Sequence, residues 1–228
     1  MSLPILVLAG LLFWGVIVAL DVVSGPQALL ARPIVAGTVA GLIAGDVAAG
    51  LRVGVLMELF ALDVLPVGAS RYPDYGPATV AAVAVVAGRS WQEWLGVATM
   101  LALPLAFAGG LAMQWLRHAN ARAVQERVAA VAAADARAIA TLHFGGLGRD
   151  ALRGAALTAA GLAVAMLLRR MTLPAQVPPL LLAAAIGSGL AAVVNGAVRS
   201  TGKGRRLAWL VAGVGVGAML SLVAGAVR

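Results

Sequence analysis

Long apolar runs separated by short polar stretches make up most of this chain. The first run covers residues 1–23, and no lysine or arginine precedes Arg32, so we expect a retained membrane helix rather than a cleaved secretion signal. Since a helix needs about 20 apolar residues to cross the hydrocarbon core, the later runs also predict crossings. These later runs cover residues 91–116, 151–168, 173–198 and 207–227.

The region from Pro33 to Pro66 is apolar but interrupted, and it predicts a broken element. Asp46 and Arg52 lie near its middle, where a single simple span would not place them. Two short halves that meet between residues 45 and 50 would accommodate both charges. Five glycines are spaced along the region, at positions 37, 41, 45, 50 and 54. Residues 78–88 are again apolar but too short to cross alone, so we expect re-entrant helical hairpins in this half.

Residues 117–142 change character, because arginines alternate with acids and a run of alanines. This pattern predicts an amphipathic helix outside the hydrocarbon or on its surface. The whole chain, 1–228, then forms one all-α polytopic membrane domain. We expect a membrane part with re-entrant elements at 1–116, a connector at 117–149, and C-terminal membrane helices at 150–228.

The composition supports a membrane protein and excludes other classes. Of the 228 residues, 62% are hydrophobic and only 11% are charged, so a water-soluble enzyme or a nucleic-acid binder is not expected. The formal net charge of +8 is better explained by cytoplasmic loops. The positive-inside rule places 117–149 in the cytoplasm, together with the basic run 199–206. The chain has no cysteine and shows no signature of an ATPase, serine hydrolase or zinc protease, so we expect no catalytic residue, metal or cofactor.

Carboxylates at membrane depth are the first candidates for a binding site, because they are costly unless they face a partner or a cavity. Glu58 has apolar neighbours on both sides in the sequence, and Asp74 lies in a stretch where Pro73 and Pro77 prevent a regular helix. Irregular backbone at this depth survives only inside protein or beside water. We therefore predict that Glu58 and Asp74 line a polar site.

Two interpretations of these carboxylates remain open. A carboxylate accepts several hydrogen bonds from the hydroxyls of an uncharged sugar, and such charge-assisted bonds are strong. Alternatively, Glu58 and Asp74 form internal ion pairs with Arg52 or Arg71. Asp63 and Arg71 are further candidates for the site, although they could simply neutralise each other.

Other polar and aromatic residues are accessory candidates. Asn195 lies in an apolar segment and could reach the site, although a hydrogen bond between helices is favoured. His143 invites a role as a phospho-acceptor or ligand, but it lacks neighbours at metal-ligand spacing, and a histidine at a helix end is favoured. Aromatic side chains near the carboxylates could pack on a sugar face, although an interfacial belt is the favoured explanation. They are Tyr72, Tyr75, Trp91 and Trp94.

Three sequence blocks stand out in the first half of the chain. The first is Arg32-Pro33, a stretch of small residues, and then Gly45-Asp46. The second is the apolar run around Met57-Glu58-Leu59, and the third is Gly68-Ala69 followed by Pro73-Asp74. Together these blocks resemble the mannose/fructose/sorbose-type IIC component of the bacterial phosphotransferase system. Asp63, Arg71 and Tyr72 depart from the small residues common in that family. The resemblance covers about residues 1–170 well and the remainder weakly.

The resemblance implies a permease subunit in the cytoplasmic membrane of a bacterium. Members of the family work with a IID membrane subunit and with cytoplasmic IIA and IIB phosphocarriers, and they form oligomers. The sugar binds within the lipid bilayer and receives phosphate from IIB, so the IIC component itself is not an enzyme. A sugar of the mannose, fructose, sorbose or amino-sugar class is expected. An ion- or proton-coupled secondary transporter that uses Glu58, or a scaffold subunit that transports nothing, remains an alternative.

Overall fold

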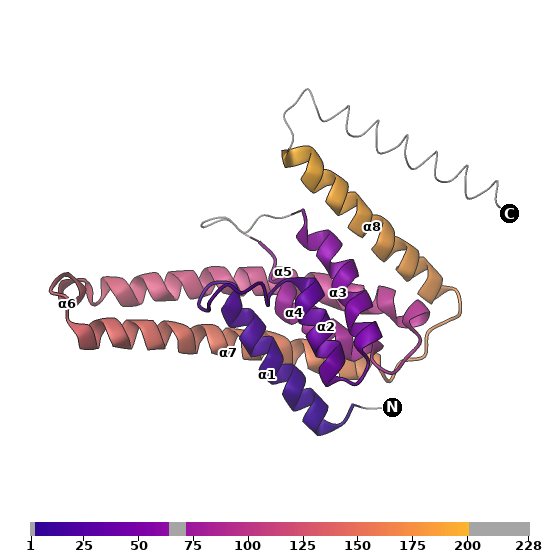
Figure 1. Ribbon diagram of the computed structural model, residues 1–228, viewed down its shortest axis with the longest axis horizontal. Coiled ribbons are helices and arrows are strands. Elements are labelled where there is room, and N and C mark those ends of the chain that lie inside the picture. Colours follow the sequence, from indigo (N-terminus) through magenta and orange to yellow (C-terminus); the bar gives the residue numbers. More distant parts are fainter. Residues whose placement is uncertain (1–2, 64–71, 201–228) are drawn as a thin grey trace.

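The structure is a computed structural model that describes residues 3–63 and 72–200, with side chains as far as residue 196. Every regular element in these ranges is a helix (Figure 1), which confirms the predicted all-α fold. The helices are α1 (Ile5–Asp21), α2 (Pro33–Ile43), α3 (Val47–Ala61), α4 (Tyr75–Val86), α5 (Trp91–Gln125), α6 (Val128–Ala132), α7 (Ala136–Leu168) and α8 (Val177–Ser200).

Helices α2 and α3 form the broken hairpin that the glycine spacing predicts. The chain reverses at Gly45, whose φ of 74° favours glycine. Asp46 then caps α3, because its side chain accepts a hydrogen bond from the backbone N–H of Ala49 at 3.0 Å. The two helices touch through glycines: a Cβ added to Gly41 would lie 2.8 Å from the Cα of Gly50. The hairpin therefore depends on backbone-to-backbone contact rather than on large side chains.

Helix α4 forms the centre of the bundle. It is only 12 residues long, yet every residue from Gly76 to Val86 is buried. Helices α1, α2, α3, α5 and α7 all pack against it. Its C-terminal end is closed by Arg169, whose Nη1 donates to the carbonyl oxygens of Ala84 at 3.0 Å and Ala87 at 2.9 Å. Arg169 is thus a buried residue that caps the C-terminal end of α4.

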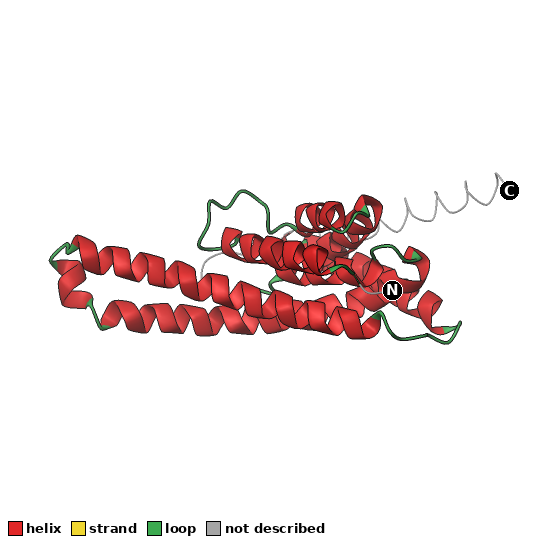
Figure 2. Cartoon of the chain, turned by 90° about the horizontal axis from the view of Figure 1, so that it is seen from below, coloured by secondary structure: helices red, strands yellow, loops and turns green. Residues whose placement is uncertain are grey.

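Helices α5 and α7 run side by side and extend well beyond the other helices, with α6 at the tip (Figures 1 and 2). At about 1.5 Å per residue, the 35 residues of α5 reach about 52 Å, whereas a hydrocarbon core is about 30 Å thick. The expected connector 117–149 is therefore no separate helix. It consists of the ends of α5 and α7 together with α6, because alanine-rich sequence continues both helices without a breaker. We call this projecting part the arm.

Three helices in the described ranges are long and apolar enough to cross a membrane: α5, α7 and α8. Helices α1, α2 and α4 are apolar but shorter, at 17, 11 and 12 residues. Long spanning helices combined with short buried ones give a polytopic membrane protein. The short helices end inside the bundle, and their ends provide the polar groups of the site.

Candidate functional site

A cavity of about 290 Å³ lies where α1 ends and where α2 and α4 begin. Three charged side chains, Asp21, Arg32 and Asp74, contribute to its wall together with the rings of Tyr72 and Tyr75. The remaining lining residues are Val22, Gln27, Leu29, Ala31, Pro33, Ala61, Pro73 and Gly76. We call this space the central cavity.

Asp21 shapes one side of the central cavity by holding the chain between α1 and α2. Its two carboxylate oxygens accept hydrogen bonds from the backbone N–H groups of Ala28, at 2.7 Å, and Ala31, at 3.2 Å. Gln27 and Leu29, the residues on either side of Ala28, adopt positive φ angles of 54° and 64°. Such strain persists only where surrounding contacts enforce it, and it concentrates at functional sites. Sequence reasoning missed Asp21, although an acid that ends an apolar helix was a usable signal.

Asp74 lies at the N-cap position of α4 and is only 2% exposed. Its backbone N–H donates to the carbonyl oxygen of Ala106 in α5 at 2.8 Å, which fixes the start of α4 against α5. Gly109 makes this contact possible, because a Cβ there would lie 2.7 Å from the Cβ of Asp74. One carboxylate oxygen of Asp74, Oδ2, pairs with Arg153 of α7. The other, Oδ1, is buried and has no hydrogen-bond partner in the structure.

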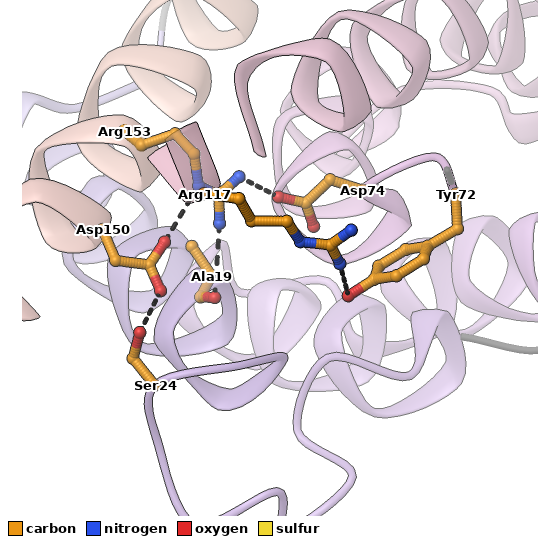
Figure 3. A network of polar contacts seen from close by, with 7 residues as sticks. All are labelled: Ala19, Ser24, Tyr72, Asp74, Arg117, Asp150 and Arg153. Carbon is orange, nitrogen blue, oxygen red and sulfur yellow. Dashed lines mark hydrogen bonds and ion pairs between the residues drawn. The ribbon is translucent and has the colours of Figure 1, made fainter. Parts of the chain in front are cut away.

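Arg153 connects two buried carboxylates (Figure 3). Its Nε donates to Oδ1 of Asp150 at 2.9 Å, and its Nη1 pairs with Asp74. Asp150 is fully buried, and its Oδ2 accepts a hydrogen bond from the Ser24 hydroxyl at 2.6 Å. The triad of two acids and one arginine carries one negative charge more than positive. The partner of Asp74 is therefore Arg153, and neither Arg52 nor Arg71 was needed to explain its burial.

Sequence reasoning missed Asp150 and Arg153. The acid and the base stand three residues apart at the start of an apolar run, which places them on one face of a helix. That spacing was the available signal. Residue 150, however, lies at the expected edge of the connector outside the hydrocarbon, where charged side chains are ordinary and do not indicate a site.

Glu58 acts on the central cavity through a neighbour. It does not line the cavity, but it forms an ion pair with Arg32, which does. Its second oxygen accepts a hydrogen bond from the backbone N–H of Ile34 at 3.1 Å, in the first turn of α2. An acid at this position also interacts favourably with the helix dipole. The internal ion pair that the sequence left open exists, but the partner is Arg32 and not Arg52.

The other candidates are distributed over the molecule. Asn195 of α8 donates a hydrogen bond to Oδ1 of Asp63 at 2.9 Å, in keeping with the structural role that the sequence favoured for it. Neither residue lines the central cavity. His143 lies on the arm beside Phe144, with ring centroids 5.3 Å apart. Arg71 lies outside the described residues.

The four aromatic candidates separate into two pairs. Tyr72 and Tyr75 line the central cavity, and the hydroxyl of Tyr72 accepts a hydrogen bond from Arg117 at 3.3 Å. Trp91 and Trp94 do not line it. Their rings instead stack against the guanidinium groups of Arg52 and Arg89, which lie 5.2 and 3.3 Å from the ring centroids. Among the residues that the structure describes, no group of three or more metal-ligating side chains gathers.

The family model for the sorbose-specific IIC component of the phosphotransferase system matches residues 5–165. The chain belongs to this family. The matched range of this sorbose-type IIC chain contains the entire wall of the central cavity and all of the Asp74–Arg153–Asp150 triad. Helix α8 lies beyond it. The central cavity therefore lies within the part of the chain that the family model matches.

A curated relative supports the same assignment. The sorbose-specific EIIC component of Klebsiella pneumoniae is 36% identical to this IIC chain over 125 residues. That alignment covers 54% of the chain and 45% of the relative, so it spans about half of either protein.

Two solved structures share the fold of this IIC chain, and both are 22% identical to it. One is described as a membrane protein and has a TM-score of 0.68. The other is a chain of the cryo-EM structure of the mannose transporter ManYZ in complex with microcin E492, with a TM-score of 0.62. In each case the match covers 100% of this chain and 97% of the other. At this identity the likeness extends to the fold alone.

Proposed function

We propose that the chain is the sugar-binding permease subunit of a phosphoenolpyruvate-dependent phosphotransferase system, and that the sugar binds in the central cavity. The observation that carries the proposal is Asp74, a buried carboxylate at the cavity wall with one oxygen unpartnered. Burying such an oxygen without a hydrogen bond is costly. A sugar hydroxyl would satisfy it, and family membership supplies the reason for a sugar.

The cavity wall offers the groups that an uncharged sugar requires. Asp74 accepts hydrogen bonds from hydroxyls, whereas Arg32 donates them, and both bonds are charge-assisted. Tyr72 and Tyr75 provide ring faces for the apolar side of the sugar. A volume of about 290 Å³ suits one monosaccharide rather than an oligosaccharide. The triad of Asp74, Asp150 and Arg153 keeps the carboxylate of Asp74 oriented while the sugar enters and leaves.

Access to Asp74 requires a movement of the wall, because this residue is only 2% exposed. The part of the wall best suited to move is the non-helical segment 22–32, which is held by the hydrogen bonds to Asp21 and contains the two positive-φ residues. The wall also includes Arg32, which Glu58 orients. In this arrangement Asp74 contacts the sugar directly, and Glu58 positions Arg32.

The remaining assignments belong to the same proposal. The subunit resides in the cytoplasmic membrane of a bacterium and is not itself an enzyme. It works with a IID membrane subunit in an oligomer, and IIA and IIB transfer the phosphoryl group to the sugar. Asp63, Asn195 and His143 do not line the central cavity and have no part in the proposed sugar site. The proton-coupled alternative relied on a lone Glu58, and the ion pair with Arg32 favours a positioning role for that acid.

Sugar uptake by the Asp74→Asn variant tests the proposal. Asparagine keeps the size of the side chain but removes the charge that strengthens the hydrogen bonds. We expect phosphoenolpyruvate-dependent uptake in vesicles to fall by about tenfold or more. Glu126→Gln, at the exposed end of α5, removes an acid far from the cavity and serves as the matched control. Equal uptake by both variants, at equal amounts of inserted protein, would remove the sugar from this cavity.

A further inference from the structure

A second cleft, of about 280 Å³, lies at the base of the arm and is distinct from the central cavity. We call it the arm cleft. Four polar side chains line it: Ser24, Asn120, His143 and Arg149. The other lining residues are Val23, Val124, Leu142, Gly146 and Leu147. No acidic side chain is among these lining residues.

The two cavities are joined by the buried polar network. Asp21 and Val22 line the central cavity, whereas Val23 and Ser24 line the arm cleft, so the same turn of chain separates them. The Ser24 hydroxyl, at the wall of the arm cleft, donates to Asp150, and Asp150 is linked through Arg153 to Asp74 (Figure 3). On α5, Gly109 packs against Asp74, and Asn120 lies eleven residues further along, a rise of about 16 Å. The arm cleft is therefore adjacent to the central cavity on the arm side.

The donors in the arm cleft suit an anion. Arg149 uses its Nε to donate to Oδ1 of Asn120 at 2.8 Å, which fixes the guanidinium plane and leaves its two terminal nitrogens for another acceptor. Gly145 lies beside this guanidinium group, because a Cβ there would be in ordinary van der Waals contact with Nη1 of Arg149, at 3.5 Å. The His143 ring and the Asn120 amide add further donors.

The positive charge around the arm cleft also favours the binding of an anion. Residues 117–149 contain five arginines and two acids, so the arm as a whole is positive. A fixed guanidinium fork matches the oxygens of a phosphoryl group, and arginine is the preferred residue for such planar recognition. The combination of fixed fork, flanking donors and absent lining acids points to phosphate chemistry.

We propose that the arm cleft binds a phosphoryl group. In transport it holds the phosphate of the newly formed sugar ester beside the central cavity, a role that rests on the proposed function above. The positive-inside rule assigns the basic arm to the cytoplasm, which is where a phosphorylated sugar leaves. Because the cleft is larger than a phosphate ion, it has room for the sugar that carries the phosphate.

Direct binding to the full chain tests the proposal, with any co-purifying membrane subunits retained, in nanodiscs of uncharged lipid. The probes are inorganic phosphate and mannose 6-phosphate, followed by calorimetry. We expect saturable binding that Arg149→Gln weakens by about tenfold or more, because one charge-assisted contact is lost. Arg137→Gln is the matched control, since it removes an exposed arginine from the same helix outside the cleft, and we expect it to bind as the natural chain does. Undetectable phosphate binding, or equal binding by Arg149→Gln and the natural chain, overturns the proposal.

Two further measurements test the cleft and identify the source of the phosphoryl group. His143→Ala, at an exposed position, tests the cleft with little risk to folding, and weaker phosphate binding supports the assignment. If nanodiscs that contain phosphatidylglycerol abolish mannose 6-phosphate binding by competition, a lipid headgroup occupies the cleft and the product role is overturned. Asp74→Asn is expected to bind phosphate normally while losing sugar uptake. A failure of the sugar site therefore leaves the phosphate result standing, and the reverse also holds.

Discussion

Replacing Arg153 with methionine should be one of the most damaging single changes in the bundle. Methionine approximates the length of the side chain but leaves Asp74 and Asp150 buried without a cation. Removing one partner from a buried ion pair costs about 3–5 kcal/mol, because the remaining charge is uncompensated. Arg153 is 9% exposed and contacts both acids as well as the carbonyl oxygen of Ala19 at 3.4 Å, so the full penalty applies.

Two comparisons isolate this electrostatic cause. Removing all three charges, as Arg153→Met with Asp74→Asn and Asp150→Asn, should recover stability to within about 2 kcal/mol of the natural chain. Arg32→Met breaks the other arginine pair, with Glu58, where the arginine side chain is 36% exposed. The Glu58 side chain is only 16% exposed, so this pair is partly buried, and Arg32→Met should lose less stability than Arg153→Met but more than the loss of a surface pair.

Equilibrium unfolding in mixed detergent micelles, followed by circular dichroism, measures these free energies. The expected order of stability is the natural chain, then Arg32→Met, then the triple variant, and last Arg153→Met. If Arg153→Met is as stable as Arg32→Met, the triad is not an electrostatically coupled unit and the reasoning fails. If the triple variant is no more stable than Arg153→Met, lost packing rather than unpaired charge explains the effect.

Two further predictions concern the wall of the central cavity. Gly109→Ala should lower the affinity for sugar, since the new Cβ would lie 2.7 Å from the Cβ of Asp74 and displace it. Gly148→Ala is the control and should leave the affinity unchanged, because a Cβ there would meet no atom within 4 Å. The sugar concentration that gives half-maximal uptake measures the affinity of both variants. Asp21→Ala should release segment 22–32 by removing two hydrogen bonds worth about 1 kcal/mol each. Faster proteolytic cleavage within that segment would confirm it, whereas unchanged cleavage would show that Asp21 is not its anchor.

The broken hairpin could be predicted from sequence because its cause is local. Glycines spaced four apart permit close contact, and Gly45 followed by Asp46 both turns the chain and caps the next helix. Asp74 could also be singled out, because Pro73 precedes it and breaks the chain there. The expectation that Pro77 prevents a regular helix was wrong, since a proline is tolerated in the first turn, and α4 begins at Tyr75. Each of these signals is contained within a few residues of chain.

The partners of the acids could not be predicted, because they depend on tertiary packing. Arg153 stands 79 residues from Asp74 in sequence, and only the packing of α7 against α4 brings them together. For an ion pair of Glu58 the sequence offered Arg52 or Arg71 as an alternative to a site role, but the α2–α3 hairpin brings Arg32 to it instead. The extent of the arm was missed for a related reason: polar composition marked a change of environment, and the helices continue through it.

A cryo-EM structure of the full complex with its sugar bound tests the central claim most directly. The account predicts sugar density in the central cavity, with a hydroxyl within hydrogen-bonding distance of Oδ1 of Asp74 and with Arg153 still paired to Oδ2. Sugar density elsewhere, with Asp74 still buried and its Oδ1 still unpartnered, would contradict the account.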